Sequence, residues 1–151
     1  MHVSFTLQSP LGPLTIAETD GHITKLSWSD GGTDTSPLLD EAKSQIDSYF
    51  AGILTRFDLP LKVRGSDLQR RACAAMQAIP FGETRTYGDL AKDLGASPQA
   101  IGQACGGNPI PILIPCHRVL GAASLGGFSG ASGIESKVWL LRHEGAAGLL
   151  I

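Results

Sequence analysis

The sequence predicts an α+β fold, in which a small antiparallel sheet with one helix is followed by a mostly helical part. Three observations carry this prediction. Alternating apolar and polar residues recur in short segments within residues 3–28. Apolar residues at helical spacing follow at about 37–51. After Gly65, helix-starting residues and glycine stops recur at short intervals, as expected for several short helices.

The first part, residues 1–64, is expected to be a scaffold domain. Its strands are the segments with period-two alternation, which turns rich in Gly, Pro and Asp separate: 3–7, 14–18 and 22–28. Residues 56–61 are expected to be one further strand or an extended link. We find no side-chain constellation suited to chemistry in this part.

The second part, residues 65–151, is expected to hold the functional site. A first helix runs to about Ile79, and two short helices, at about 87–94 and 98–106, meet across Gly95 as a helix-turn-helix. A last helix is predicted at about 133–144. Three capping-box sequences, which begin at Ser66, Thr86 and Ser132, support these starts.

The helix at 98–106 is unusual because Gly102 and Gly106 each cost about 1 kcal/mol relative to alanine. Small residues at alternate positions let another surface approach the backbone closely. That surface is either a neighbouring helix or a nucleic-acid groove, since a narrow minor groove would demand small residues.

Composition excludes several classes of protein. The net charge is −2, divided as −3 over residues 1–64 and +1 over residues 65–151, so a strongly basic nucleic-acid binder is not indicated. No apolar run approaches the ~20 residues of a membrane span, and no secretory signal is visible. Three cysteines, an odd number, suggest free thiols in a cytoplasmic setting. Scattered histidines and the absence of C-x-x-C spacing predict no metal.

The stretch from Asn108 to Arg118 attracts most attention. Its prolines predict a stiff, extended apolar segment that ends on Cys116. Cys116 is then either a buried packing residue or a nucleophile that His117 activates, by way of a water molecule or a turn. A base of this kind needs a carboxylate to orient it, and Glu144 and Asp89 are the candidates.

Four ordered motifs resemble the O6-alkylguanine-DNA alkyltransferase family, also called methylated-DNA–protein-cysteine methyltransferases. They cover residues 65–145 densely and consist of Gly82-Glu83-Thr84-Arg85-Thr86-Tyr87-Gly88, Asn108-Pro109, Pro115-Cys116-His117-Arg118-Val119 and Lys137-Val138-Trp139-Leu140-Leu141-Arg142-His143-Glu144. The resemblance implies an RNase H-like N-terminal domain and a winged-helix-like C-terminal domain.

The resemblance also implies a chemistry. Cys116 would take an alkyl group irreversibly from O6 of a flipped guanine (or from O4-alkylthymine), so that each protein molecule acts once. His117 would draw the proton from Cys116 through water, Glu144 would orient His117, and Asn108 would connect the helix-turn-helix to the active-site segment.

Binding residues are carried over from the family in the same way. Those expected around the substrate base are Tyr87, Val119, Phe128, Ser129 and Lys137. Those expected on the DNA are Thr86, Gln99, Ala100, Gly102, Gln103, Cys105, Gly106 and Arg118. The implied partner is double-stranded DNA with an alkylated guanine, bound through the minor groove by a monomer, with no cofactor and no membrane.

This sequence departs from the family pattern in three places. Gln99 replaces an arginine that fills the space of the flipped base, and Phe128 replaces a tyrosine. The loop at 130–133 is slightly longer than usual, which either widens the alkyl pocket or is absorbed as slack.

Two alternative functions remain open from the sequence. One is a sensor that binds alkylated DNA and flags it for other repair, although such alkyltransferase-like proteins typically have tryptophan at the position of Cys116. The other is a thiol hydrolase that regenerates Cys116, which would have no use for a groove-shaped helix.

Overall fold

The computed structural model describes residues 2–121 and 133–146. The chain divides into two compact units, Met1–Val63 and Arg64–Ile151, and each is described by itself. None of the described helices is long and apolar enough to cross a membrane.

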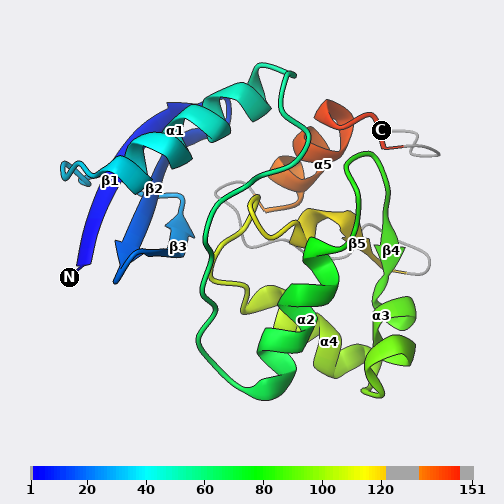
Figure 1. Ribbon diagram of the computed structural model, residues 1–151. Helices are drawn as coiled ribbons and strands as arrows, with labels where there is room; N and C mark the ends of the chain where they lie inside the picture. Colours follow the sequence, from blue (N-terminus) through cyan, green and yellow to red (C-terminus); the bar gives the residue numbers. More distant parts are fainter. Residues whose placement is uncertain (1, 122–132, 147–151) are drawn as a thin grey trace. The chain divides into compact units, whose positions relative to one another are not determined.

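The first unit is a three-stranded antiparallel sheet with one helix. The strands are β1 (His2–Ser9), β2 (Gly12–Thr19) and β3 (His22–Ser27), in the order β1-β2-β3. Helix α1 (Pro37–Phe50) packs on β1 and β2 (Figure 1). This confirms the α+β fold expected for the first part, with strand and helix bounds within about two residues of those predicted.

Its core comes from the inward face of the sheet and the apolar side of α1. Leu14, Ile16 and Ile23 of the sheet are fully buried, as are Ala42 and Ile46 of the helix. The segment at 56–61 is a link rather than a full strand, because Leu61 alone forms a bridge, to Ile23.

The second unit consists mainly of short helices. Its elements are α2 (Asp67–Gln77), β4 (Arg85–Thr86), α3 (Tyr87–Leu94), α4 (Pro98–Gly106), the 3₁₀ turn η1 (Cys116–Arg118), β5 (Val119–Leu120) and α5 (Ile134–His143). Helix α4 packs against α2 and α3, and β4 and β5 form a two-stranded parallel sheet (Figure 1).

The helix-turn-helix begins and ends as the sequence predicts. Thr86 and Asp89 form a complete capping box at the start of α3. Gly95 ends that helix with φ of 65°, a left-handed conformation that glycine adopts at little cost. Ser97 then caps α4, and Pro98 occupies its first turn.

The other two expected capping boxes are incomplete. Ser66 accepts a hydrogen bond from the Gln69 backbone N–H, but the Gln69 side chain donates to the Ala104 carbonyl at 2.8 Å instead of reaching back. At the start of α5, Gly133 is the N-cap, and no side chain caps the helix there. At α2 the box is incomplete because Gln69 makes a tertiary contact instead. At α5 it is incomplete because the helix starts one residue later than predicted.

The expectation of a stiff, extended segment from Asn108 to Pro115 is wrong. The chain folds into a tight turn, in which the Ile114 N–H donates to the Ile110 carbonyl at 2.8 Å. Ile112 adopts φ of 72°, which a β-branched residue rarely does. The whole of residues 110–119 is buried, so the segment lies in the interior on every side, and packing around it sets the backbone rather than the proline pattern.

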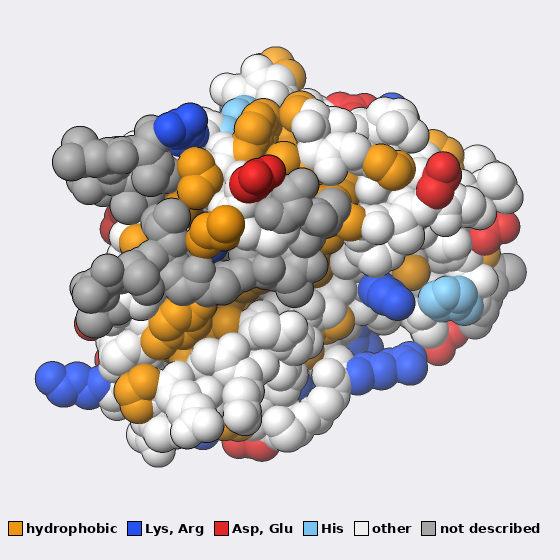
Figure 2. All heavy atoms as spheres, turned by 180° about the vertical axis from the view of Figure 1, so that it is seen from behind, with side chains coloured by type: hydrophobic (Ala, Val, Ile, Leu, Met, Phe, Trp, Pro, Cys, Tyr) orange, Lys and Arg blue, Asp and Glu red, His pale blue; other side chains and the backbone are white. Residues whose placement is uncertain are grey.

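Basic side chains are dispersed over the face that Figure 2 shows. On the face shown in Figure 2, Lys and Arg of the described residues are scattered among other side chains and form no single continuous patch. A contact with an anionic partner would therefore depend on local shape and on individual residues more than on a broad positive field.

Candidate active site around Cys116

Cys116 opens the turn η1 and is 5% exposed. Its backbone N–H donates to the Ile114 carbonyl at 2.8 Å, which joins η1 to the buried turn before it. Because the backbone turns at this point, the side chains of Cys116 and His117 are not forced to opposite faces as they would be in a strand.

A buried network links η1 to the end of α5. His117 Nε2 lies 2.7 Å from Glu144 Oε2. Arg118 donates to the same carboxylate twice, from Nε to Oε1 at 2.8 Å and from Nη2 to Oε2 at 3.0 Å. Of the two carboxylates that the sequence left open, Glu144 therefore meets His117, whereas Asp89 is engaged in the cap of α3.

The charges in this network fix the tautomer of His117. The hydrogen bonds from His117 and Arg118 hold the pKa of Glu144 at about 2, although burial alone would raise it, so Glu144 is ionised and accepts. The proton of neutral His117 must then lie on Nε2. The other ring nitrogen, Nδ1, is buried and has no hydrogen-bond partner among the described residues, so its lone pair is free to act as the base.

The resting thiol of Cys116 is neutral. Burial raises its pKa to about 11, while a hydrogen bond with the Asn108 side chain and the nearby charge of Lys137 act in the opposite direction. Burial likewise lowers the pKa of His117. Only about one thiol in ten thousand is ionised at pH 7 with such a pKa, so the proton must leave as the sulfur reacts.

Asn108 holds the turn that precedes Cys116. Its Nδ2 donates to the Ile114 carbonyl at 2.9 Å, and its Oδ1 accepts from the Ile110 N–H at 3.0 Å. Asn108 also forms a hydrogen bond with Cys116, so its side chain joins the segment after α4 to the turn η1.

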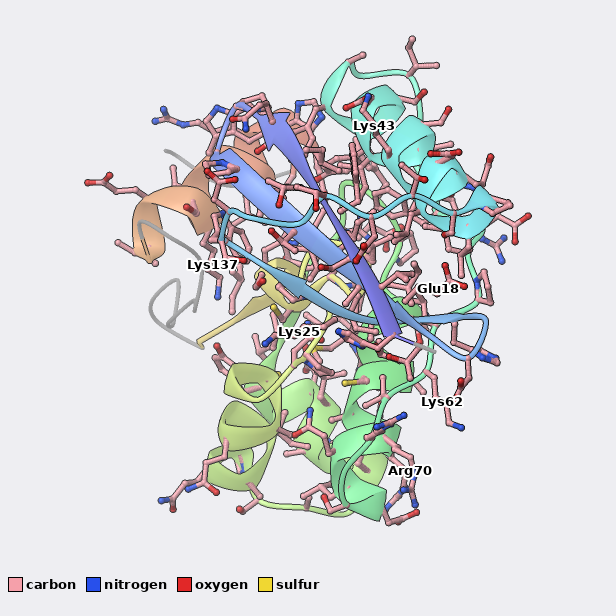
Figure 3. The ribbon with its side chains drawn as sticks, turned by 90° about the vertical axis from the view of Figure 1, so that its left-hand side faces the viewer. Glu18, Lys25, Lys43, Lys62, Arg70 and Lys137 are labelled. Carbon is pink, nitrogen blue, oxygen red and sulfur yellow. The ribbon has the colours of Figure 1, made fainter. Side chains whose placement is uncertain are left out.

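Lys137 enters the site from α5 (Figure 3) and is fully buried. Its Nζ donates to the Val119 carbonyl at 2.6 Å and lies 5.8 Å from the centre of the Tyr87 ring. Burial lowers the pKa of Lys137 to about 8, which still leaves it mainly charged at pH 7. Lys137, Val119 and Tyr87, all expected near the substrate base, are thus brought together.

The outer face of α4 carries the expected DNA residues. Gln99, Gln103 and Gly106 are exposed, and Ala100 and Gly102 are half-buried. A methyl group placed on Gly102 or Gly106 would meet no described atom within 4 Å. Packing against a neighbouring helix, one of the two explanations for these glycines, therefore does not account for them among the described residues.

Two expected DNA residues lie elsewhere. Arg118 is 7% exposed, with its guanidinium bound to Glu144 and, through Nη1, to the Ile79 carbonyl at 2.6 Å. Cys105 is 5% exposed and faces Met76 of α2, with the two sulfurs 3.5 Å apart. Both are interior residues: Cys105 contacts Met76 of α2, and Arg118 binds Ile79, just after α2, and Glu144 at the C-cap of α5. Thr86 is half-buried, and its hydroxyl caps α3.

Sequence reasoning missed the residues that support the site from α2. Gln69 ties α2 to the Ala104 carbonyl near the end of α4, and the Ile79 carbonyl anchors Arg118. No local pattern marks either contact, since each joins residues 35 or more positions apart.

Three sequence features lie outside the described residues. They are Phe128, Ser129 and residues 130–132 of the longer loop, of which only Gly133 is described.

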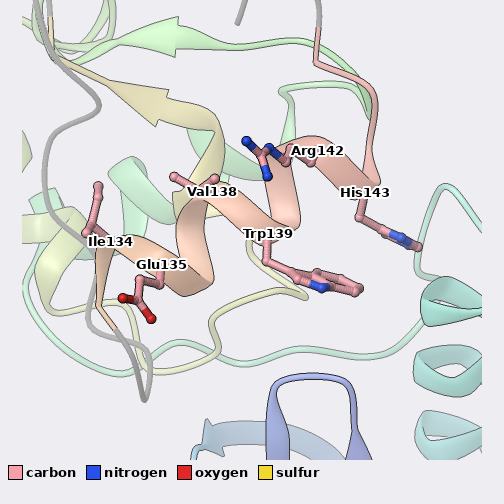
Figure 4. Close-up of a pocket in the computed structure, with 6 residues that line it drawn as sticks. All are labelled: Ile134, Glu135, Val138, Trp139, Arg142 and His143. Atoms are coloured by element: carbon pink, nitrogen blue, oxygen red, sulfur yellow. The ribbon is translucent and has the colours of Figure 1, made fainter. Parts of the chain in front are cut away.

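A hollow of about 650 Å³ lies along α5, and Lys137 and Glu144 are not among the residues that line it (Figure 4). It is lined by Ile134, Glu135, Val138, Trp139, Arg142 and His143, and the Trp139 and His143 rings stack at 4.9 Å. None of these side chains was an expected site residue.

Comparison with known proteins gives two matches to sequence families. The family profile described as "6-O-methylguanine DNA methyltransferase, DNA binding domain" matches residues 67–146. That described as "6-O-methylguanine DNA methyltransferase, ribonuclease-like domain" matches residues 3–63.

Individual relatives cover nearly the whole chain. A methylated-DNA–protein-cysteine methyltransferase of Mycolicibacterium paratuberculosis is 44% identical over 92% of this chain and 90% of its own. The constitutive enzyme of that name from Bacillus subtilis is 40% identical, over 95% and 96% of the two chains. The structure of Mycobacterium tuberculosis OGT in complex with DNA aligns with a TM-score of 0.85 at 43% identity, over 94% of this chain and 92% of that one.

Proposed function

Because this chain belongs to the 6-O-methylguanine DNA methyltransferase family, we propose that it repairs DNA by moving an alkyl group from O6 of guanine to the sulfur of Cys116. O4-alkylthymine is a possible second substrate of the same reaction. The observation that carries the proposal is a buried thiol, Cys116, in the same turn as His117, whose ring is held by the buried Glu144 carboxylate at 2.7 Å.

The transfer is a nucleophilic displacement at the alkyl carbon. His117 Nδ1 takes the thiol proton, by way of a water molecule, as the Cys116 sulfur attacks the alkyl carbon. A C–S bond forms and the bond from that carbon to O6 breaks, so that guanine leaves as an anion and regains a proton. Glu144 stabilises the imidazolium that forms in this step.

The proposal explains why the resting site has no thiolate. An ionised thiol would react with other electrophiles in the cell, whereas a neutral buried thiol is inert. Proton removal that is coupled to attack confines the reaction to a base that has entered the site. The thioether is stable, so each protein molecule acts once.

Lys137 and Tyr87 are the residues we propose beside the entering base, with the backbone of Cys116 and Val119 and with Phe128 and Ser129. The ammonium of Lys137 lies where negative charge develops on the leaving guanine. A preorganised cation in a buried site stabilises such charge without rearrangement.

Double-stranded DNA is the proposed partner, and α4 is the proposed contact in its minor groove. Helix α4 contains no charged side chain. Its outward glycines leave room for sugars and bases in a groove only about 6 Å wide. Gln99 would occupy the gap left by the flipped base and would hydrogen-bond the unpaired cytosine.

We expect a monomer in the cytoplasm. Cys73, Cys105 and Cys116 are all free thiols, which suits a reducing compartment.

A repair assay separates this function from the alternatives. Duplex DNA with one O6-methylguanine is incubated with increasing amounts of protein, and the guanine regenerated in the DNA is counted. We expect one guanine per protein molecule and then no further repair. Binding without regenerated guanine would favour the sensor, and many guanines per molecule would favour a hydrolase.

A further inference from the structure

Arg118 has a place in the site that its expected role on DNA does not explain. Its guanidinium makes three hydrogen bonds, two to Glu144 and one to the Ile79 carbonyl. It also lies 5.9 Å from the centre of the Phe81 ring. A side chain with all these contacts, and 7% exposed, has no reach to a phosphate.

We propose that Arg118 is a positioning residue of the transfer, which fixes the Glu144 carboxylate and offsets its charge so that His117 is held as a neutral base. This inference rests on the proposed function, because it concerns the same proton transfer. It adds a fourth member to the chain of Cys116, His117 and Glu144.

The Glu144 carboxylate is held in one orientation by Arg118. Glu144 Oε2 is shared between His117 Nε2 at 2.7 Å and Arg118 Nη2 at 3.0 Å. A carboxylate on a single bond can rotate, but one held by the planar fork of an arginine cannot. The third hydrogen bond, to the Ile79 carbonyl just after α2, holds the guanidinium in place. Arg118 in turn orients Glu144, and Glu144 orients the His117 imidazole.

The charge of Arg118 also acts on the protonation of His117. The charged groups that act on His117 among the described residues are Glu144 at the C-cap of α5, Lys137 of α5 and Arg118 of η1 itself. An isolated carboxylate at 2.7 Å would favour the imidazolium. A protonated imidazole cannot accept the thiol proton, so a counter-cation on the far side of Glu144 keeps the base in its working form.

The test compares two substitutions at this position. Arg118→Met removes the charge, and Arg118→Lys keeps the charge but loses the fork. Single-turnover methyl transfer is measured across pH 5 to 9, and the His117 imidazole is titrated in parallel by NMR. Thermal unfolding and near-UV circular dichroism establish that each variant is folded.

Arg118→Met is expected to move the acidic limb of the rate profile, and the His117 titration, to higher pH. If the acidic limb moves by about one pH unit, methyl transfer by Arg118→Met is about fivefold slower than by the wild type at the pH where the wild-type rate is half-maximal. Arg118→Lys is expected to keep the limb in place and to lower the plateau rate. A limb that stays in place in folded Arg118→Met, or moves equally in both variants, overturns the proposal.

Arg118→Gln gives a second neutral variant if Arg118→Met does not fold, because its amide can still donate a hydrogen bond to Glu144. The His117 titration is again expected to move to higher pH, and an unchanged titration overturns the proposal. The NMR readout does not require methyl transfer. A wild type that transfers no methyl group would therefore count against the proposed function and not against the role of Arg118.

Discussion

Glu144 contributes both to the stability of the fold and to the proposed chemistry. Its side chain is fully buried and ionised, and both His117 and Arg118 pair with its carboxylate. The sequence alone left Glu144 and Asp89 as equal candidates, since Glu144 lies 27 positions from His117 and only the fold brings them together. The family resemblance made the choice that residue patterns could not.

The lowered pKa of Glu144 predicts acid sensitivity. A carboxyl group whose pKa falls from 4.5 to about 2 on folding contributes stability that is fully present above pH 4.5 and is lost as pH falls toward 2. The free energy of unfolding is expected to drop by about 3 kcal/mol across this window from this group alone. Chemical denaturation at pH 7, 4 and 3 measures it.

Two variants provide the comparison for this pH dependence. Glu144→Gln is expected to be less stable at pH 7 by about 3 kcal/mol, because it strands the buried Arg118, and to approach the wild type as pH falls. Glu135→Gln removes an exposed carboxyl group from the same helix and should keep the wild-type profile. A Glu144→Gln deficit that persists unchanged at pH 3 would contradict the assignment.

Asn108 carries the second prediction at this scale. Asn108→Ala leaves the buried Ile110 N–H without its partner and removes one of the two hydrogen bonds to the Ile114 carbonyl, at a cost of about 2 kcal/mol in unfolding free energy. Asn108→Asp keeps the acceptor for Ile110 but places a negative charge beside Cys116, so methyl transfer should slow more than stability falls. Transfer by folded Asn108→Asp at the wild-type rate would show that Asn108 does not support the sulfur.

Helix α4 shows at the scale of an element what local sequence can and cannot predict. Ser97, Pro98 and Gly95 set its start and the turn before it, because caps depend on neighbours in sequence. The inward direction of Cys105 was not predictable in the same way, since Met76 comes from another helix. The turn at 110–114 was missed because proline patterns predict extension and tertiary burial overrides them.

Gly102 separates stability from DNA binding. A methyl group at this position meets no described atom, so Gly102→Ala is expected to stabilise the protein by about 1 kcal/mol and yet to weaken binding to duplex DNA. Denaturation and fluorescence anisotropy measure the two effects. Ala74→Gly, at an exposed position of α2, is the control: it makes the opposite exchange in a helix and should lower stability by a similar amount. Unchanged DNA affinity in Gly102→Ala would remove this face of α4 from the interface.

Gln99 and Gln103 lie one turn apart on the exposed face of α4 and allow a matched comparison. Gln99→Arg is expected to speed repair of duplex substrate more than repair of the free base, because the longer cation fills the gap left by the flipped base. Gln103→Arg adds the same charge and should steepen the salt dependence of binding by about one unit without that gain. Equal acceleration on duplex and free base would show that residue 99 does not assist flipping.

At the scale of the whole molecule, charge does not indicate a DNA partner. The net charge is −2. In the second unit Lys137 and Arg118 are buried, and Arg85 is paired with Asp93 at 2.7 Å. Composition alone therefore gave no sign of a DNA partner. The motifs in residues 65–145 did, and the relatives support them.

All residues of the proposed chemistry fall within the second unit, whose described part begins at Arg64. The first unit matches the ribonuclease-like profile of the same family over residues 3–63. Its fold followed readily from sequence, since period-two alternation and short turns are local signals.

The most direct test of the central claim is intact-protein mass analysis after incubation with duplex DNA that contains O6-methylguanine. We predict a gain of one methyl group, mapped to Cys116 by peptide analysis, equally present in Cys105→Ser and absent in Cys116→Ser. Tight binding of the DNA with no change in protein mass, or a methyl group on any other residue, would contradict the account.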